Sequence, residues 1–165
     1  MLSIQQLVET VEELLSEHER LLQLAERKKQ ALIKGDMEAL QAVVNEEVQF
    51  IRKVEILEER RQEQGRQIAV QYGIRLEELT ASKLAALEPE PQRAAKIKLL
   101  TGRFAKVIGE IKAANELNGQ LIRQSLDLVQ RSIDLLVDVS DAGVYTDKGN
   151  VGQTVGQKRF FDKQA

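Results

Sequence analysis

The stretch LIRQSLDLVQRSIDLLVDV, residues 121–139, ends a long helical pattern and decides the fold. The chain has no internal proline between Pro91 and about Ser140, which predicts one long helix. Over residues 121–139 the apolar side chains cover about half of the helix circumference, and the other half is polar. A helix that becomes more apolar toward its end needs a partner there, from its own chain or from another molecule. This requirement is typical of a binding protein.

The composition favours the same fold class. Aromatic residues make up 4% of the 165 residues, while Leu, Glu, Gln, Arg, Lys and Ala are abundant, as in helical bundles and coiled coils. We predict an all-α protein, an antiparallel bundle or coiled-coil hairpin of three long helices and one short helix. The helical domain covers residues 1–142 and a flexible glycine-containing tail covers residues 143–165. The helices are expected at about 3–33, 37–72, 76–87 and 92–140.

Local signals set these boundaries. Ser3 is a predicted N-cap, the Lys34-Gly35-Asp36 turn joins two antiparallel helices, and Gly73 ends the second helix. Thr80 is a possible cap of the short helix, and Pro91 suits the first turn of the last one. The apolar stripe of the second helix includes Val44, Val48 and Ile51. Residues 58–67 are almost wholly polar, so this stretch is either a solvated extension of the helix or a frayed one.

Charge and composition exclude several classes of function. The net charge of −2 does not indicate a nucleic-acid partner. The lack of cysteine fits a cytoplasmic protein, and no apolar run approaches the roughly 20 residues that a membrane-spanning helix needs. We therefore expect a cytoplasmic protein that has no membrane insertion and takes no cofactor.

Catalytic and metal-binding signatures are not found in the sequence. His18 is the single histidine, and it falls in the apolar seam of the first helix without a carboxylate at the spacing of a di-iron site. We expect a structural histidine, no metal site and no catalytic residues. Asn115 and Asn118 fall near the centre of the apolar stripe of the last helix. They either fix the register of packing or mark a hydrated interface.

Several segments together resemble the FlgN family of flagellar export chaperones. They are the leading heptad helix, the Lys-Gly-Asp turn, the stretch Asn115-Glu-Leu-Asn118-Gly119-Gln-Leu-Ile122 and the exit Tyr145-Thr-Asp-Lys-Gly149. The resemblance implies a chaperone that binds the C-terminal helical segment of hook-associated (hook–filament junction) proteins and prevents their premature assembly or aggregation. It also implies delivery of these clients to the cytoplasmic domain of the flagellar export gate.

The resemblance implies roles for particular residues. The client would bind the apolar end of the last helix, at Leu121, Ile122, Leu126, Val129, Ile133, Leu136 and Val137. Tyr145 matches a tyrosine that docks on the export gate, although it could instead be a hydrophobic staple at the helix end. The cluster Arg159-Phe160-Phe161 near the C-terminus resembles endings found in the family. It is either part of an inert tail or a short linear motif that orders on contact.

Other functions remain open from the sequence. The first alternative is a structural coiled-coil adaptor or scaffold that self-associates through the same apolar face. The related filament-cap chaperones differ in the client and not in the chemistry. The oligomeric state distinguishes a chaperone from an adaptor. We expect a chaperone to be a monomer or a weak homodimer without its client. An adaptor would be a tight dimer.

Overall fold

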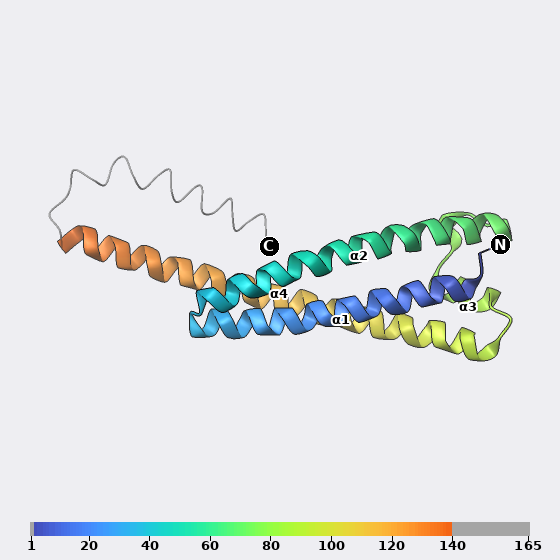
Figure 1. The fold of residues 1–165 in the computed structure, drawn as a ribbon, viewed down its shortest axis with the longest axis horizontal. Helices are drawn as coiled ribbons and strands as arrows, with labels where there is room; N and C mark the ends of the chain where they lie inside the picture. Colours follow the sequence, from blue (N-terminus) through green and yellow to red (C-terminus); the bar gives the residue numbers. More distant parts are fainter. Residues whose placement is uncertain (1, 140–165) are drawn as a thin grey trace. The chain divides into compact units, whose positions relative to one another are not determined.

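The fold is taken from a computed structural model, which describes the backbone of residues 2–139 and the side chains of residues 2–136. Every regular element in this range is helical, which confirms the all-α prediction (Figure 1). The elements are α1 (Ile4–Lys34), α2 (Met37–Tyr72), the 3-10 helix η1 (Leu76–Glu78), α3 (Ala81–Leu87) and α4 (Pro91–Val139). The chain forms two compact units, Met1–Ala114 and Asn115–Ala165, and their boundary falls inside the sequence of α4.

Helices α1 and α2 begin and end at the predicted caps. The hydroxyl of Ser3 accepts a hydrogen bond from the backbone N–H of Gln6, whose side chain in turn accepts from the N–H of Ser3. Gly35 ends α1 with φ 67°, a left-handed conformation that glycine adopts without steric cost. The Asp36 carboxylate then caps α2 by accepting from the N–H of Ala39 at 3.0 Å. The two-residue turn makes α1 and α2 antiparallel neighbours.

Packing and charge both join α1 to α2. Leu14 and Val43 are almost fully buried, and Leu57 is buried further along α2. Lys28 pairs with Glu47 at 2.8 Å where both side chains are largely covered. Apolar burial contributes most to the hairpin, because the desolvation of a largely covered ion pair offsets much of its Coulomb energy.

The polar stretch of α2 remains a regular helix. Gly65 lies inside residues 58–67 and is buried. Ile68, the first residue after this stretch, is completely buried. A side chain at Gly65 would reach Leu76 and Leu79 at ordinary contact distance, so the η1 segment covers this part of α2. The stretch is therefore neither frayed nor wholly solvated. Its buried positions support α2 up to its end at Gly73.

The short helix predicted over residues 76–87 is divided in two. The 3-10 turn η1 ends at Glu78, and α3 begins at Ala81 after Thr80, whose hydroxyl accepts from the N–H of Lys83 at 3.2 Å. The structure confirms the predicted cap at Thr80. Because a capping residue takes an extended backbone conformation, this cap separates α3 from η1.

A buried carboxylate organises the turn that leads into α4. The side chain of Glu88 is almost fully covered and accepts hydrogen bonds from the backbone N–H of Glu90 and from Arg93, each at 3.1 Å. Pro91 is the first residue of α4, as predicted, because its missing N–H would have no partner in the first turn of a helix. The Glu88–Arg93 pair therefore holds the chain in the geometry that starts α4.

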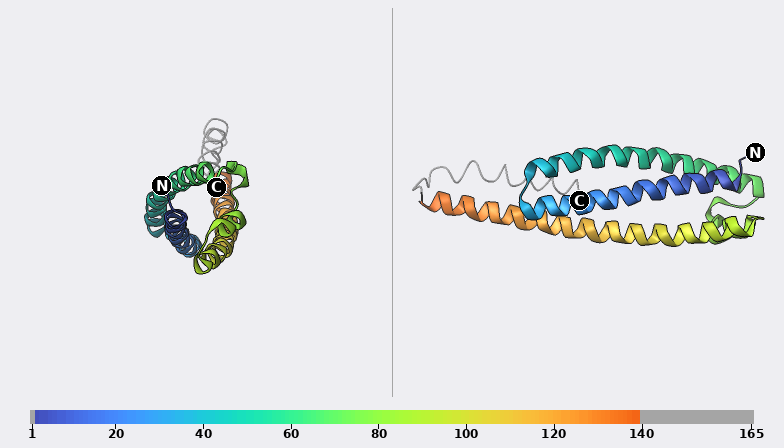
Figure 2. Two further views of the ribbon diagram at one scale, coloured as in Figure 1. Left: turned by 90° about the vertical axis from the view of Figure 1, so that its right-hand side faces the viewer. Right: turned by 60° about the horizontal axis from the view of Figure 1, so that its bottom comes forward.

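Within residues 2–114, α1 contacts α2 and also the first part of α4 (Figure 2). Lys96 and Arg103 of α4 pair with Glu12 and Glu19 of α1, at 2.6 and 2.7 Å. Both pairs connect residues that are 84 positions apart, so α1 and α4 run in the same direction. The core of this unit is formed by buried side chains from α1, α2, α3 and α4, including Ile4, Leu7, Val8, Leu15, Ile68, Leu84, Ile97, Leu100 and Val107.

Candidate functional site

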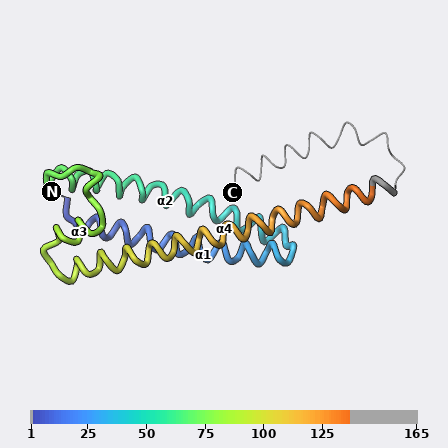
Figure 3. Tube along the Cα trace, turned by 180° about the vertical axis from the view of Figure 1, so that it is seen from behind, coloured from blue at the N-terminus to red at the C-terminus, as the bar shows by residue number. Residues whose placement is uncertain are grey.

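The predicted client-binding residues lie in the second unit, on the last part of α4 (Figure 3). Helix α4 extends from Pro91 to Val139. Val129, Ile133 and Leu136 are 56%, 41% and 70% exposed. They are spaced four and three residues apart, so they share one side of the helix. We call these three residues the α4 face.

The remaining predicted residues of this set differ in exposure. Leu121, Ile122 and Leu126 are half-buried. The side chain of Val137 lies outside the described residues. Among the described side chains, the exposed part of the predicted site therefore runs from Val129 to Leu136.

Two further leucines beside the α4 face were not among the predicted contact residues. Leu128 and Leu135 are 66% and 67% exposed, about as much as Leu136. The signal was present in the sequence, because both residues belong to the apolar half of the helix in residues 121–139. A ligand on the α4 face would have these leucines at its edge.

Two serine hydroxyls next to these apolar side chains already have acceptors. Ser125 donates to the carbonyl of Leu121 and Ser132 donates to the carbonyl of Leu128, both at 2.9 Å. A hydroxyl that is bonded within its own helix can be covered by a partner without leaving an unsatisfied donor. The surface can therefore be desolvated at low cost.

The first part of α4 contributes one side of its helix to the core. Ile97, Leu100 and Val107 are buried there. The same helix thus provides a core-forming segment and, further along, a segment with exposed apolar side chains. Asn115 is exposed and Asn118 is buried, and whether Asn118 fixes register or marks a hydrated interface stays a prediction.

His18 packs as a structural residue. Its Nδ1 atom lies 2.7 Å from the carbonyl oxygen of Leu14, and its ring lies 4.9 Å from the ring of Phe104. A hydrogen bond to the backbone one turn earlier and an aromatic contact satisfy this half-buried side chain. Among the described residues no group of three or more His, Asp or Glu side chains could hold a metal ion.

The resolved pKa shifts mark surface ion pairs and not a reactive centre. Hydrogen bonds from Arg27 hold the pKa of Glu46 below its ordinary value, and hydrogen bonds from Arg61 do the same for Glu58. Both carboxylates lie at the surface of α2. Glu46 pairs with Arg27 of α1, and Glu58 pairs with Arg61 of α2 itself. Neither arrangement provides an acid and a base with separated pKa values in a cleft.

The other residues predicted to bind partners belong to the C-terminal part of the sequence. Tyr145 and the cluster Arg159, Phe160 and Phe161 lie outside the described residues, as does the predicted tail. No helix in the described part of the chain is both long enough and apolar enough to cross a membrane.

Comparison with known proteins identifies the family. The profile described as FlgN protein matches residues 1–153, most of the chain. A protein described as "Uncharacterized protein YvyG" from Bacillus subtilis (strain 168) is 26% identical over 136 residues, which is 82% of this chain and 82% of that protein. No solved structure matches the chain. The chain therefore belongs to the FlgN family, a family of flagellar export chaperones.

Proposed function

We propose that this chaperone binds the C-terminal helical segment of a hook-associated protein on the α4 face. One observation carries the proposal: Val129, Ile133 and Leu136 are exposed on one side of a regular helix. Exposed apolar side chains gathered on one helix side are typical of a surface that a partner covers. An amphipathic client helix would match the spacing of the three residues, as in helix-in-groove recognition.

Covering the client is the mechanism. The segment that polymerises or aggregates when exposed would be held against the α4 face until export, in the cytoplasm. Leu121, Ile122, Leu126 and Val137 would extend the contact along the helix. No chemical step is involved, so the chaperone acts only through the difference in free energy between free and bound client.

The second partner in the proposal is the export gate. Tyr145 follows α4 in the sequence and would dock on the cytoplasmic domain of the gate while the client is bound. The support is the similarity of the Tyr145-Thr-Asp-Lys-Gly149 segment to the family pattern. The cluster Arg159-Phe160-Phe161 is a further candidate contact in the same part of the chain.

The test is a titration with a synthetic C-terminal peptide of a hook-associated protein, followed by calorimetry and by light-scattering mass. We expect a monomer or weak dimer that binds one peptide per chain. The double variant Val129→Asp, Ile133→Asp should lose binding. Leu99→Asp is the matched control, because Leu99 is 63% exposed on the first part of the same helix.

Two results would contradict the proposal. A tight dimer that ignores the peptide would refute the chaperone proposal and favour a coiled-coil adaptor. Equal loss of binding in Leu99→Asp would show that the effect is not local to the α4 face.

A further inference from the structure

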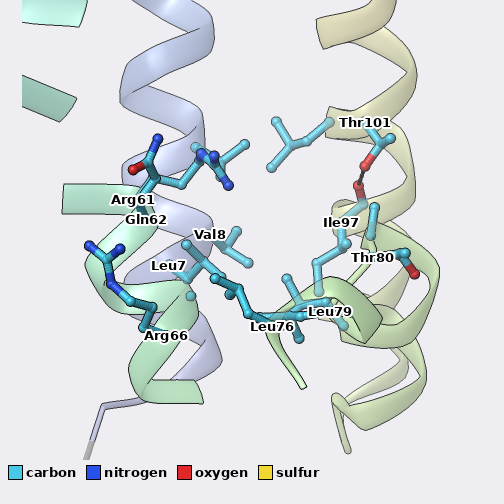
Figure 4. A pocket seen from close by; sticks show the side chains of 15 residues that line it. Leu7, Val8, Arg61, Gln62, Arg66, Leu76, Leu79, Thr80, Ile97 and Thr101 are labelled. Carbon is cyan, nitrogen blue, oxygen red and sulfur yellow. Dashed lines mark hydrogen bonds between the residues drawn. The ribbon is translucent and has the colours of Figure 1, made fainter. Parts of the chain in front are cut away.

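Apolar side chains gather in a pocket of the first unit and on the α4 face, and these two places differ in exposure. The pocket has a volume of about 450 Å³ and is lined by residues of α1, α2, η1, α3 and α4 (Figure 4). Leu7, Val8 and Ile97 in its wall are only 4–5% exposed, so they belong to the core. Val129 and Ile133 of the α4 face are about half exposed. The α4 face therefore offers a ligand more apolar area than these pocket residues do.

An uncovered α4 face is a liability for a chain that has not yet met its client. Contiguous exposed apolar side chains promote association and aggregation. Leu128 and Leu135 beside the face are 66% and 67% exposed, which enlarges the apolar surface. A segment that covers part of this surface, and that a client can displace, would protect the free chain.

The sequence after α4 contains an aromatic segment of this kind, residues 158–163, which read KRFFDK. We call these residues the Phe-Phe segment. Phe160 and Phe161 are two of the four phenylalanines in the chain. Because aromatic side chains bring a large apolar area at a small cost in conformational entropy, two adjacent rings suit a short contact with an apolar helix face.

The connection between α4 and the Phe-Phe segment has a suitable length. It consists of residues 140–157 and contains glycine at positions 143, 149, 152 and 156. A glycine-rich connection of this length spans about 23 Å on average. Val129 and Ile133 lie about 15 and 9 Å before the end of α4 along the helix axis. The segment therefore reaches the α4 face without stretching the connection, and its effective concentration there is about 1 mM.

The charges of the two segments are opposite. Residues 126–139 contain three aspartates and one arginine, a net charge of −2, and the Phe-Phe segment contains three cations and one aspartate, a net charge of +2. Within the described part of the chain, Asp134 makes no ion pair and accepts a hydrogen bond from Gln130 at 2.9 Å. Gln130 is one turn before Ile133, so this carboxylate borders the α4 face and is open to a cation.

We propose that the Phe-Phe segment docks on the α4 face of its own chain and that the client displaces it. Phe160 and Phe161 cover Val129 and Ile133, and a cation of the segment faces Asp134. This inference rests on the proposed function, because it assigns a regulation to the same face. At the effective concentration given above, a segment with a dissociation constant of about 0.5 mM covers the face in about two thirds of the molecules. Competition then weakens the apparent client affinity about threefold.

A spin label locates the segment in the full chain. The chain has no cysteine, so Gln164→Cys provides a single site for a nitroxide beside the Phe-Phe segment. With labelled Ile, Leu and Val methyl groups, we expect the nitroxide to broaden the NMR signals of Val129 and Ile133. Addition of the C-terminal peptide of a hook-associated protein should restore both signals, because the client displaces the segment.

Two double variants test the role of the aromatic rings. Phe160→Ser with Phe161→Ser should remove most of the broadening and should tighten client binding about threefold, because the face is then uncovered. The matched control is Val151→Ser with Val155→Ser, which changes two apolar residues of the connection and leaves the rings in place. This control should keep both the broadening and the client affinity of the original chain.

A second pair of variants tests the charge. Asp134→Asn should lower the covered fraction from about two thirds to about half, because an exposed ion pair contributes about a factor of two. Glu116→Gln is the matched control: Glu116 is eighteen residues earlier, which is five full turns, so it lies on the same side of α4 far from the α4 face. The covered fraction should not change in Glu116→Gln.

Three outcomes would overturn the inference. They are broadening that persists when both rings are replaced, no broadening in the original chain, and broadening that requires a labelled chain and a second chain in the same sample. The third would place the segment on a second copy. The proposed function fails separately, because a chain that binds no client still reports the segment through the spin label. Client binding without any broadening would refute this inference alone.

Discussion

Replacing Leu136 with alanine separates client binding from folding. The side chain is 70% exposed in the free protein, so its removal takes little from the core. The free energy of unfolding should change by less than about 0.5 kcal/mol, as for other surface substitutions. Client affinity should respond much more strongly, because a client helix on the α4 face would cover the part of Leu136 that water now contacts.

The size of the binding effect follows from this exposure. Full burial of a leucine contributes about 1.5–3 kcal/mol, so covering the exposed 70% of Leu136 contributes about 1–2 kcal/mol. Alanine loses most of that contribution. The dissociation constant for the client peptide should therefore rise about five- to thirtyfold.

Leu99→Ala is the matched control for this measurement. Leu99 is 63% exposed on the same helix, so the substitution removes the same atoms from a similarly exposed position in the first unit. Calorimetry gives the affinity of each variant and thermal unfolding gives its stability. Unchanged affinity in Leu136→Ala, or an equal loss in Leu99→Ala, would refute the assignment of the client to the α4 face.

Three further predictions concern the first unit. Leu14→Ala should lower the free energy of unfolding by about 2–5 kcal/mol in denaturant titrations, because Leu14 is 1% exposed, and a loss below about 1 kcal/mol would mean that this core is loosely packed. Gly35→Ala should destabilise by about 1 kcal/mol, because φ is 67° there, and a neutral result would argue against the left-handed cap. The hydrogen bond from Arg27 lowers the pKa of Glu46 in the folded chain. As the pH falls through about 4.5, the unfolded chain therefore binds more protons than the folded chain, and the free energy of unfolding decreases. Arg27→Met should flatten this acid-side slope in unfolding experiments at a series of pH values, and an unchanged slope would exclude the pair as a cause.

The helix boundaries were accessible from the sequence because local chemistry sets them. Five residues each satisfy or remove a backbone group at a helix end, and the structure confirms all of them: Ser3, Gly35, Asp36, Gly73 and Pro91. Such caps need no knowledge of distant residues. The division between η1 and α3 was missed because apolar spacing placed the start of the short helix at residue 76, although Thr80 had the chemistry of a cap.

Burial depended on neighbours that the sequence does not place. Val48 and Ile51 belong to the predicted stripe of α2, yet they are 45% and 46% exposed. Conversely, Gly65 sits in a polar stretch and is buried because Leu76 and Leu79 lie over it. The pocket on this side of α2 has no signature in the sequence, since its lining is brought together from α1, α2, α3, α4 and η1 only by packing.

Hydrogen–deuterium exchange of the full chain, with and without the C-terminal peptide of a hook-associated protein, tests the central claim most directly. The account predicts that the peptide slows exchange across residues 121–139 and leaves residues 93–107 unchanged. Exchange that stays fast across 121–139 while calorimetry shows bound peptide would contradict the account and place the client elsewhere on the chain.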